Sequence, residues 1–248
     1  IYSKLVSLGR PLRIVVARSN HDRMLPFLKL LPAVEHAEYA PIKNPVRVES
    51  GKAAADWTAE RLIAEAEQRA VPIELNTWLE AGNRIEDFMP TVPTTHHYEI
   101  RLGPVATYLA DRALVPFTQR ARFMCFYCAN RDTNRRWGGW KPEDWGRLAK
   151  LIAQRCGLPG FVFLGAEWDR EYVSLVLKKV HQPALDLVGK LPLEASLEVV
   201  RRSIYLVAFP SGIPILATVM GCPNLMFYPK RLEKLIGAWP PSVMVEGG

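Results

Sequence analysis

Residues 202–229, RSIYLVAFPSGIPILATVMGCPNLMFYP, constrain the fold more than any other stretch of the chain. The apolar run 204–208 is rich in β-branched and aromatic residues, which is typical of a strand buried on both faces. Proline and glycine at 210–212 break that run and predict a sharp turn. Residues 213–220 have the length of a short helix, and 224–228 predict a second buried strand. The stretch is therefore interpreted as a strand–helix–strand unit of a parallel sheet.

The turn of this unit, at Ser211 and Gly212, is a candidate anion site. A small turn between a strand and a helix leaves backbone N–H groups at the helix N-terminus, facing the crevice at the carboxyl ends of the strands. Ser211 is also placed to cap the helix. The turn alone is explained equally well by an ordinary strand–helix corner that binds nothing, because such short motifs recur by chance.

The rest of the chain repeats the alternation of strands and helices. Beyond residue 120, strands are predicted at 122–129, 161–164 and 184–188, and helices at 142–155, 169–180 and 193–202. The earlier part predicts strands at 13–17, 36–40 and 73–75, and helices ending at 31 and spanning 52–70 and 98–114. The aperiodic, proline-marked segment 115–120 predicts a boundary. We therefore expect an α/β protein with two Rossmann-like domains, 1–118 and 119–248, whose parallel sheets face across a cleft.

Charge and composition limit the classes of partner. The content of apolar residues, 49%, and of charged residues, 23%, is that of a globular protein. No apolar run approaches the roughly 20 residues that cross a bilayer. The net charge of +7 favours anionic partners, which include phosphorylated sugars and an acidic membrane surface. Because the basic residues are dispersed, nucleic acid is not an expected partner.

The four cysteines predict neither a disulfide framework nor a metal site, which fits a reducing compartment, the cytoplasm. Cys125 and Cys128 form a CxxC pair inside a strand-like run, so their thiols are expected to point to opposite faces and to belong to the core. His96 and His97 lack a third ligand at suitable spacing. No metal and no cofactor are expected.

Several landmarks of the second half occur in an order and spacing that resemble a known family. They are WKPEDW at 140–145, FVFLG at 161–165 followed by Asp169 and Glu171, DLVGKLPLE at 186–194, the Ser211–Gly212 turn, and GCP at 221–223. In this order they resemble the ADP-heptose:lipopolysaccharide heptosyltransferase family of GT-B glycosyltransferases. The resemblance covers roughly residues 122–245, about half of the chain.

The resemblance implies an inverting, metal-independent transfer of a sugar from a nucleotide-diphosphate donor to a sugar or glycolipid acceptor. It implies that the C-terminal domain holds the donor, while the N-terminal domain forms the acceptor side. By position, Ser211 and Gly212 would meet the diphosphate, and Arg135 and Arg136 would supply cationic forks for its oxygens. Asp169 or Glu171 would lie near the nucleotide ribose. The protein would act in the cytoplasm, and its charge leaves association with the inner face of the membrane open.

The sequence also departs from the family pattern. Pro210 and Ile215 stand where the family usually has an acidic residue and a histidine, which leaves the identity of the donor open. The family's glycine-rich first loop, with its catalytic aspartate, is expected upstream of Ile1, so the catalytic base is unknown. His21 and Asp22, after the first strand, are the candidates within this sequence, although a solvated loop explains them as well.

Two rival interpretations follow from these departures. The first is a catalytically lapsed protein that binds a nucleotide sugar, which the missing acid and histidine would suit. The second is a basic, non-enzymatic surface that binds nucleic acid or an anionic membrane.

Overall fold

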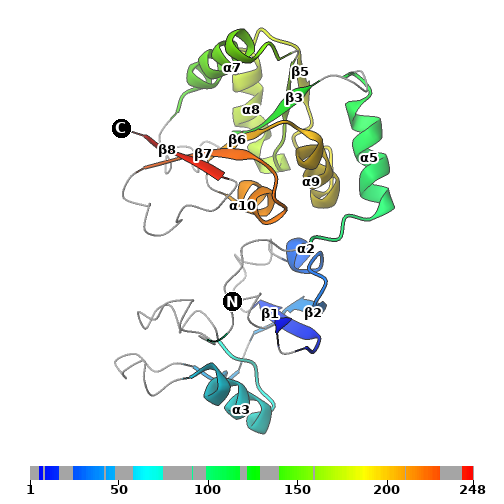
Figure 1. Ribbon diagram of the computed structural model, residues 1–248, viewed down its shortest axis with the longest axis vertical. Helices are drawn as coiled ribbons and strands as arrows, with labels where there is room; N and C mark the ends of the chain where they lie inside the picture. The colour runs from blue at the N-terminus through cyan, green and yellow to red at the C-terminus, as the bar shows by residue number, and fades with distance from the viewer. Residues whose placement is uncertain are drawn as a thin grey trace. The chain divides into compact units, whose positions relative to one another are not determined.

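The computed structural model divides the chain into two units, residues 1–101 and 102–248, each described here by itself (Figure 1). The description covers residues 6–7, 9–16, 25–41, 43–47, 58–74, 91, 99–117, 122–128, 140–158, 160–209, 211–229 and 242–247. Among the helices in these ranges, none is both long enough and apolar enough to span a bilayer.

The first unit contains a small parallel sheet. β1 (Leu12–Val16) pairs in parallel with β2 (Val34–Tyr39), and the short helix α2 (Leu25–Leu28) lies between them in the sequence. Within the described residues, the strand predicted at 73–75 is reduced to a single parallel bridge between Ile73 and Val46. The described part of this unit therefore has a two-stranded sheet rather than the full sheet that we predicted.

Helix α3 (Ala59–Arg69) of the first unit begins later than the predicted start at residue 52. Thr58 has an extended backbone, and its hydroxyl accepts a hydrogen bond from the Arg61 amide at 3.2 Å. This arrangement is an N-cap, which satisfies one of the amides that a helix start leaves without a partner. Leu62 is buried on the inner side of the helix, as its amphipathic pattern predicts.

The second unit is built on one six-stranded parallel sheet with the order β5-β4-β3-β6-β7-β8 (Figure 1). Its strands are β3 (Phe123–Tyr127), β4 (Gly160–Phe163), β5 (Ala184–Asp186), β6 (Leu206–Ala208), β7 (Asn224–Pro229) and β8 (Ser242–Gly247). The first five match predicted strands. The last, β8, was not predicted, and it pairs along the whole of β7.

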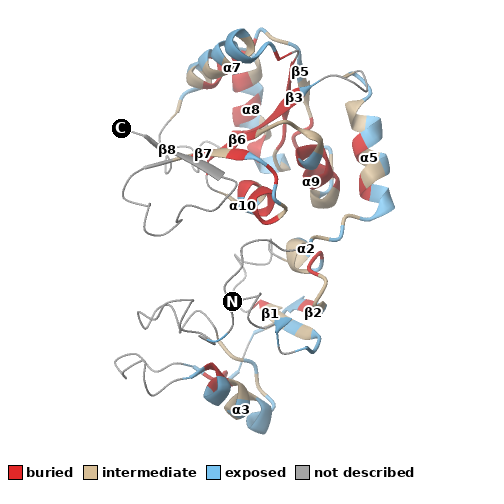
Figure 2. Ribbon diagram, in the orientation of Figure 1, coloured by how far each residue is buried: buried red, intermediate tan, exposed pale blue. Residues whose placement is uncertain are grey.

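Helices cover both faces of this sheet. α7 (Pro142–Cys156) and α8 (Arg170–Leu177) pack on one face, around Trp145, Val173 and Val176. α5 (Pro104–Leu114), α9 (Leu193–Arg202) and α10 (Gly212–Val219) contribute buried residues to the core on the other face. Figure 2 shows the buried strands between helices whose outward sides are exposed. The predicted doubly covered parallel sheet is confirmed for this unit.

Strand β3 sends alternate side chains into the two cores. Phe126 and Cys128 belong to the core under α7 and α8, whereas Cys125 and Tyr127 belong to the core on the opposite face. The predicted divergence of the CxxC thiols is therefore confirmed. Burial raises the pKa of Cys125 to about 12, and burial also raises the pKa of Cys128. Both thiols remain protonated at neutral pH, as buried structural cysteines do.

Helix α5 starts at Pro104, not at residue 98, because Gly103 is its N-cap and proline suits the first helical position. The helix lies in the second unit, whereas the boundary predicted between 118 and 119 would place it in the first. Its buried Ala110 faces the core, and Asp111 pairs with Arg202 of α9 at 2.5 Å. The assignment of an acceptor side and a donor side to the two units stays a prediction.

A buried carboxylate fastens the end of α9. The Glu198 side chain is 1% exposed and accepts hydrogen bonds from the guanidinium groups of Arg201 and Arg202 at 2.8–2.9 Å. Burial alone would raise the pKa of Glu198, but these hydrogen bonds lower it below its ordinary value of 4.5. Because Arg202 also pairs with Asp111, the carboxylate supports the contact between α9 and α5.

We expect Glu198→Gln to lower the free energy of unfolding by about 1–3 kcal/mol at neutral pH, because it weakens the three charge-assisted hydrogen bonds from Arg201 and Arg202. The folded-state pKa is the lower one, so the stabilisation is present above 4.5 and is lost as the pH falls through the folded-state pKa. Urea denaturation of both proteins over a descending pH series measures this difference. Glu143→Gln is the control, because its ion pair with Lys179 is exposed to solvent and should contribute little to stability. Equal losses in the two variants would contradict the assignment.

Candidate functional site

The strand order of the second unit creates a switch point between β3 and β6. From β3 the chain continues to β4 and β5 on one side, whereas β6, β7 and β8 follow one another on the other side. In open α/β sheets, ligands bind outside the carboxyl ends of the strands at such a point. β3 ends at Tyr127 and β6 ends at Ala208, so the residues that follow these two ends define the candidate site.

The turn after β6 leads into the N-terminus of α10. Gly212 and Ile213 occupy the first positions of this helix, and their amides find no acceptor among the residues that the structure describes. Pro214 follows and has no amide to offer. Two amide donors and the positive end of the helix dipole therefore mark this end of the sheet.

Ser211 stands at the N-cap of α10 but makes no capping hydrogen bond, so its predicted capping role is wrong. The usual partner of a capping hydroxyl is the amide of the second or third helical residue, and the third is Pro214. The Ser211 Oγ atom is buried beside the Tyr127 hydroxyl, and within the described part of the chain it makes no hydrogen bond of good geometry. A buried hydroxyl without a partner costs about 1–3 kcal/mol, so an added oxygen ligand here would gain a ready donor.

Tyr127, at the end of β3, and Asp169, in the turn after β4, form a buried polar contact. Asp169 is 1% exposed, and its Oδ2 accepts from the Tyr127 hydroxyl at 3.3 Å and from the Ala166 amide at 2.9 Å. Burial, together with the charge of Asp169, raises the pKa of Tyr127, so the phenol stays protonated and remains the donor. The contact joins the end of β3 to the turn after β4.

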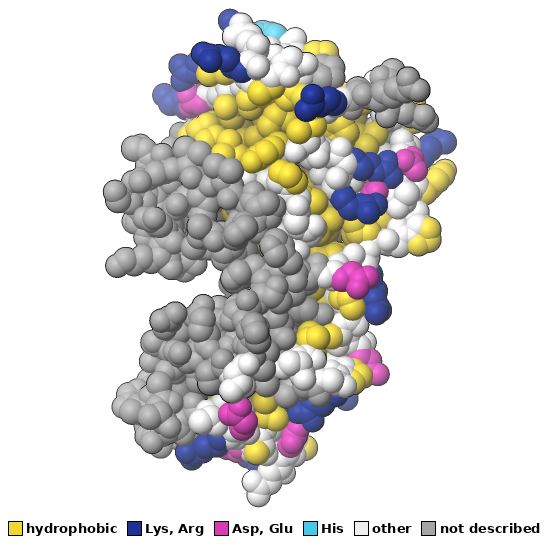
Figure 3. All heavy atoms as spheres, in the orientation of Figure 1, with side chains coloured by type: hydrophobic (Ala, Val, Ile, Leu, Met, Phe, Trp, Pro, Cys, Tyr) yellow, Lys and Arg dark blue, Asp and Glu magenta, His cyan; other side chains and the backbone are white. Residues whose placement is uncertain are grey.

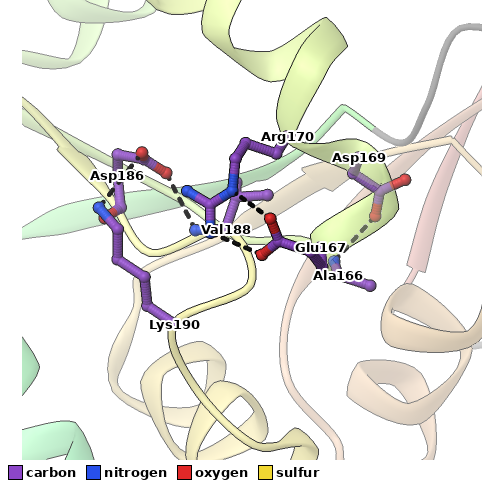
Figure 4. Close-up of polar contacts among 7 residues, drawn as sticks. All are labelled: Ala166, Glu167, Asp169, Arg170, Asp186, Val188 and Lys190. Carbon is purple, nitrogen blue, oxygen red and sulfur yellow. Dashed lines mark hydrogen bonds and ion pairs between the residues drawn. The ribbon is translucent and has the colours of Figure 1, made fainter.

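Two ion pairs surround the turn after β4 and the turn after β5 (Figure 4). The guanidinium of Arg170 forms a fork with the Glu167 carboxylate, with both distances 2.6 Å. Lys190 Nζ lies 3.2 Å from Asp186 Oδ2 and also donates to the Asp186 carbonyl. Gly189, with φ +66°, brings the second turn so close to Glu167 that a Cβ atom at this position would collide with it. The two turns thus hold each other in place.

The structure brings some of the predicted site residues together. Ser211 and Gly212 follow β6 and Asp169 follows β4, and these two strands flank β3. Glu171 lies in the first turn of α8 with an exposed side chain. Ile215, at the position where a histidine was expected, is 37% exposed on α10. The remaining predicted residues lie outside the described part of the chain: Arg135, Arg136, Pro210, His21, Asp22 and the pair His96 and His97.

Sequence reasoning missed Tyr127 and Trp168 as residues of this edge. Tyr127 is the last residue of β3, and a polar aromatic residue at the carboxyl end of a buried strand was an available signal. Trp168 lies in the single-turn helix η3 (Glu167–Asp169) that follows β4, and it is 54% exposed.

Metal ligands and cavities do not point to another site. Among the described residues, no three His, Cys, Asp or Glu side chains are grouped so that they would hold a metal ion. A cavity of about 400 Å³ in the first unit is lined by Pro11 and Ala33, which precede β1 and β2. It therefore lies at the amino ends of those strands, where α/β sheets do not bind their ligands.

The fold of this unit is that of a doubly wound α/β domain, and the candidate site lies at the edge where such domains bind their ligands. No protein-family profile and no curated protein sequence matches the chain. Solved structures do match it. A glycosyl transferase family 9 protein from Veillonella parvula superposes with a TM-score of 0.59 and 15% identity, covering 96% of this chain and 86% of that one.

A second structure, the ADP-heptose lps heptosyltransferase II of E. coli, matches with a TM-score of 0.61 and 11% identity. The match covers 98% of this chain and 84% of that chain. Identities this low show a shared fold. The resemblance to the heptosyltransferases that we predicted from residues 122–245 is thus confirmed at the level of the fold, and it extends over nearly the whole chain.

We expect Asp169→Ala to lower the free energy of unfolding by about 1–3 kcal/mol, because it leaves the Tyr127 hydroxyl and the Ala166 amide without this acceptor. Glu171→Ala, which removes an exposed carboxylate two residues later, should change stability by less than about 0.5 kcal/mol. Denaturant melts measure both. Unchanged stability in Asp169→Ala would show that the carboxylate is not a structural anchor, and the predicted contact with the ribose would then be its remaining role.

Proposed function

We propose that the chain is a glycosyltransferase that binds a nucleotide-diphosphate sugar at the carboxyl edge of the second unit. It transfers the sugar to a sugar or glycolipid acceptor with inversion and without a metal. The observation that carries the proposal is the N-terminus of α10 at the switch point, where two amides have no acceptor among the described residues and the buried Ser211 hydroxyl makes no hydrogen bond of good geometry with them. The fold shared with two glycosyltransferases supports the same class of reaction. In this proposal the two units are Rossmann-like domains that face across a cleft.

The chemistry assigned to this edge is stabilisation of the leaving group. In the transfer, an acceptor hydroxyl oxygen bonds to the anomeric carbon while the bond from that carbon to the diphosphate oxygen breaks. Negative charge then develops on the diphosphate, and the helix N-terminus with Ser211 provides donors aimed at it. Arg135 and Arg136 are proposed to add guanidinium forks on the same oxygens. The acceptor proton passes to a base, for which His21 and Asp22 are the candidates in this sequence.

The name of the E. coli relative gives the donor that we propose to test first, an ADP sugar. Pro210 and Ile215 favour a second candidate function, binding of a nucleotide sugar without turnover. The exposed Ile215 side chain places an apolar group on α10 where the family resemblance implies an imidazole beside the phosphates. Nucleotide-sugar binding without release of the nucleotide in the presence of acceptors would favour this alternative.

A nucleic-acid function has less support. On the face shown in Figure 3, Lys and Arg side chains are scattered and several lie next to Asp or Glu, rather than forming a stripe. Among the described residues, Arg147, Arg170, Lys179, Lys190, Arg201 and Arg202 are engaged in ion pairs. We therefore propose the nucleotide sugar and its acceptor as partners, in the cytoplasm, with an anionic membrane surface as the further option for the net positive charge.

We expect Gly212→Val to abolish binding of nucleoside diphosphates and of inorganic pyrophosphate while the protein stays folded. A Cβ atom at Gly212 meets no protein atom within 4 Å, so the side chain has room in the fold but would occupy the approach to the amides. Gly103→Val is the matched control, since Gly103 also starts a helix with open space at its Cβ position. Calorimetric titration with ADP and pyrophosphate, together with thermal melts, separates the effects. Normal affinity in folded Gly212→Val would exclude the turn from the site.

We expect the double substitution of Arg135 and Arg136 by alanine to weaken pyrophosphate binding, each charge-assisted contact being worth about 1.5–3 kcal/mol. Replacing Arg147 and Arg155 of α7 by alanine removes the same charge from an exposed helix surface and serves as the control. The same titrations measure both variants. Parallel losses in the two would indicate a general effect of net charge, and an unchanged affinity would remove Arg135 and Arg136 from the site.

A further inference from the structure

Trp168 is a large aromatic side chain at the carboxyl edge of the sheet, and the roles assigned above do not use it. It lies at the middle of η3, directly after β4, and 54% of it is exposed. Its neighbour Asp169 is buried and anchored, whereas Glu167 on its other side is exposed and paired with Arg170. The exposed aromatic surface therefore lies at the edge where this class of fold binds its ligands.

The backbone that carries Trp168 is held from three directions. Asp169 accepts from the Ala166 amide and from Tyr127 at the end of β3, which fixes the turn on its buried side. The Glu167–Arg170 fork closes the turn on its exposed side. Gly189 of the turn after β5 packs against Glu167 without room for a side chain. A support of this kind is preorganised, so a ligand that stacks on it loses little affinity to the ordering of the protein.

The distance between this turn and α10 fits a nucleoside diphosphate. β6 and β4 both pair with β3, and neighbouring strands lie about 4.8 Å apart, so the ends of β6 and β4, from which the two turns start, are about 10 Å apart. This is about the reach from a diphosphate to the base of the same nucleotide. With the diphosphate at Ser211 and Gly212, the nucleoside extends across the end of β3 toward η3.

We propose that Trp168 forms the base-stacking surface of the donor site. The proposal rests on the proposed function, because it needs the diphosphate at the N-terminus of α10. An indole ring offers a π-face that stacks on any nucleobase, so Trp168 contributes affinity for a nucleoside over a bare phosphate rather than a choice among bases. The buried Asp169 then serves as the anchor of this surface.

The test compares ligands with and without a base. ADP, GDP and UDP are titrated calorimetrically into the full chain, with inorganic pyrophosphate as the probe that lacks a base. Trp168→Ala should weaken the tightest-binding nucleoside diphosphate by about 5- to 150-fold, equivalent to about 1–3 kcal/mol, and leave pyrophosphate affinity unchanged. Trp168→Phe, which keeps a flat ring, should recover most of the loss. Tyr108→Ala on α5 is the control, because this aromatic is 59% exposed on a different element.

The outcomes separate this inference from the proposed function. Wild-type protein that binds neither pyrophosphate nor any of the three nucleotides overturns both. Wild-type protein that binds them, with a Trp168→Ala variant that behaves like Tyr108→Ala, overturns the stacking surface alone. Equal losses for pyrophosphate and nucleotide in Trp168→Ala would likewise overturn it, because they would indicate a general disturbance of the edge. Thermal melts of each variant show that the comparison is made on folded protein.

Discussion

Burial of the sheet on both faces is the constraint on which the second unit depends. Phe126, Phe161 and Phe163 pack together on one face with Trp145, and Val199, Val200 and Leu206 pack on the other. Two apolar layers disfavour unpaired polar groups along the strands, and the Asn224 Oδ1 atom, buried and unpaired among the described residues, lies at the first residue of β7. Much of the polar chemistry of this unit therefore lies beyond the strands, including the ion pairs in the turns after β4 and β5. The location of the candidate site is in this sense a consequence of the core.

At that edge, stability and binding are assigned to different groups. Asp169 is a carboxylate with partners inside the fold, and its removal would leave the Tyr127 hydroxyl and the Ala166 amide without this acceptor. Ser211 is the opposite case, because its buried hydroxyl lies beside Tyr127 and makes no hydrogen bond of good geometry with the described residues. Such an arrangement costs free energy, and under the proposed function an oxygen of the ligand would accept the hydrogen bond from this hydroxyl.

The sequence predicted those helices and strands of the second unit whose start, end and buried face are determined by their own residues. The helix predicted at 193–202 has those bounds, because amphipathic spacing and a proline before it define both its face and its start. The helix predicted from residue 52 was extended too far, because the apolar pattern continued past a cap that only Thr58 supplied. β8 was missed, since its place depends on pairing with β7 rather than on a pattern in the preceding residues. The burial of Asp169 depends on Tyr127, which is distant in sequence, so no local pattern could reveal it.

The order in which the sheet is assembled adds a consequence for the protein during its synthesis. β8 is the last strand of the described chain to leave the ribosome, and it alone pairs with the outer side of β7. Until it arrives, β7 presents an open row of backbone donors and acceptors beside an apolar core, which is a template for pairing with another chain. All of the sheet's pairings are parallel and join residues distant in sequence, so closure of this edge is also slow. Pairing with segment 242–247 covers the backbone groups of β7 and makes β8 itself the edge strand on this side of the described sheet.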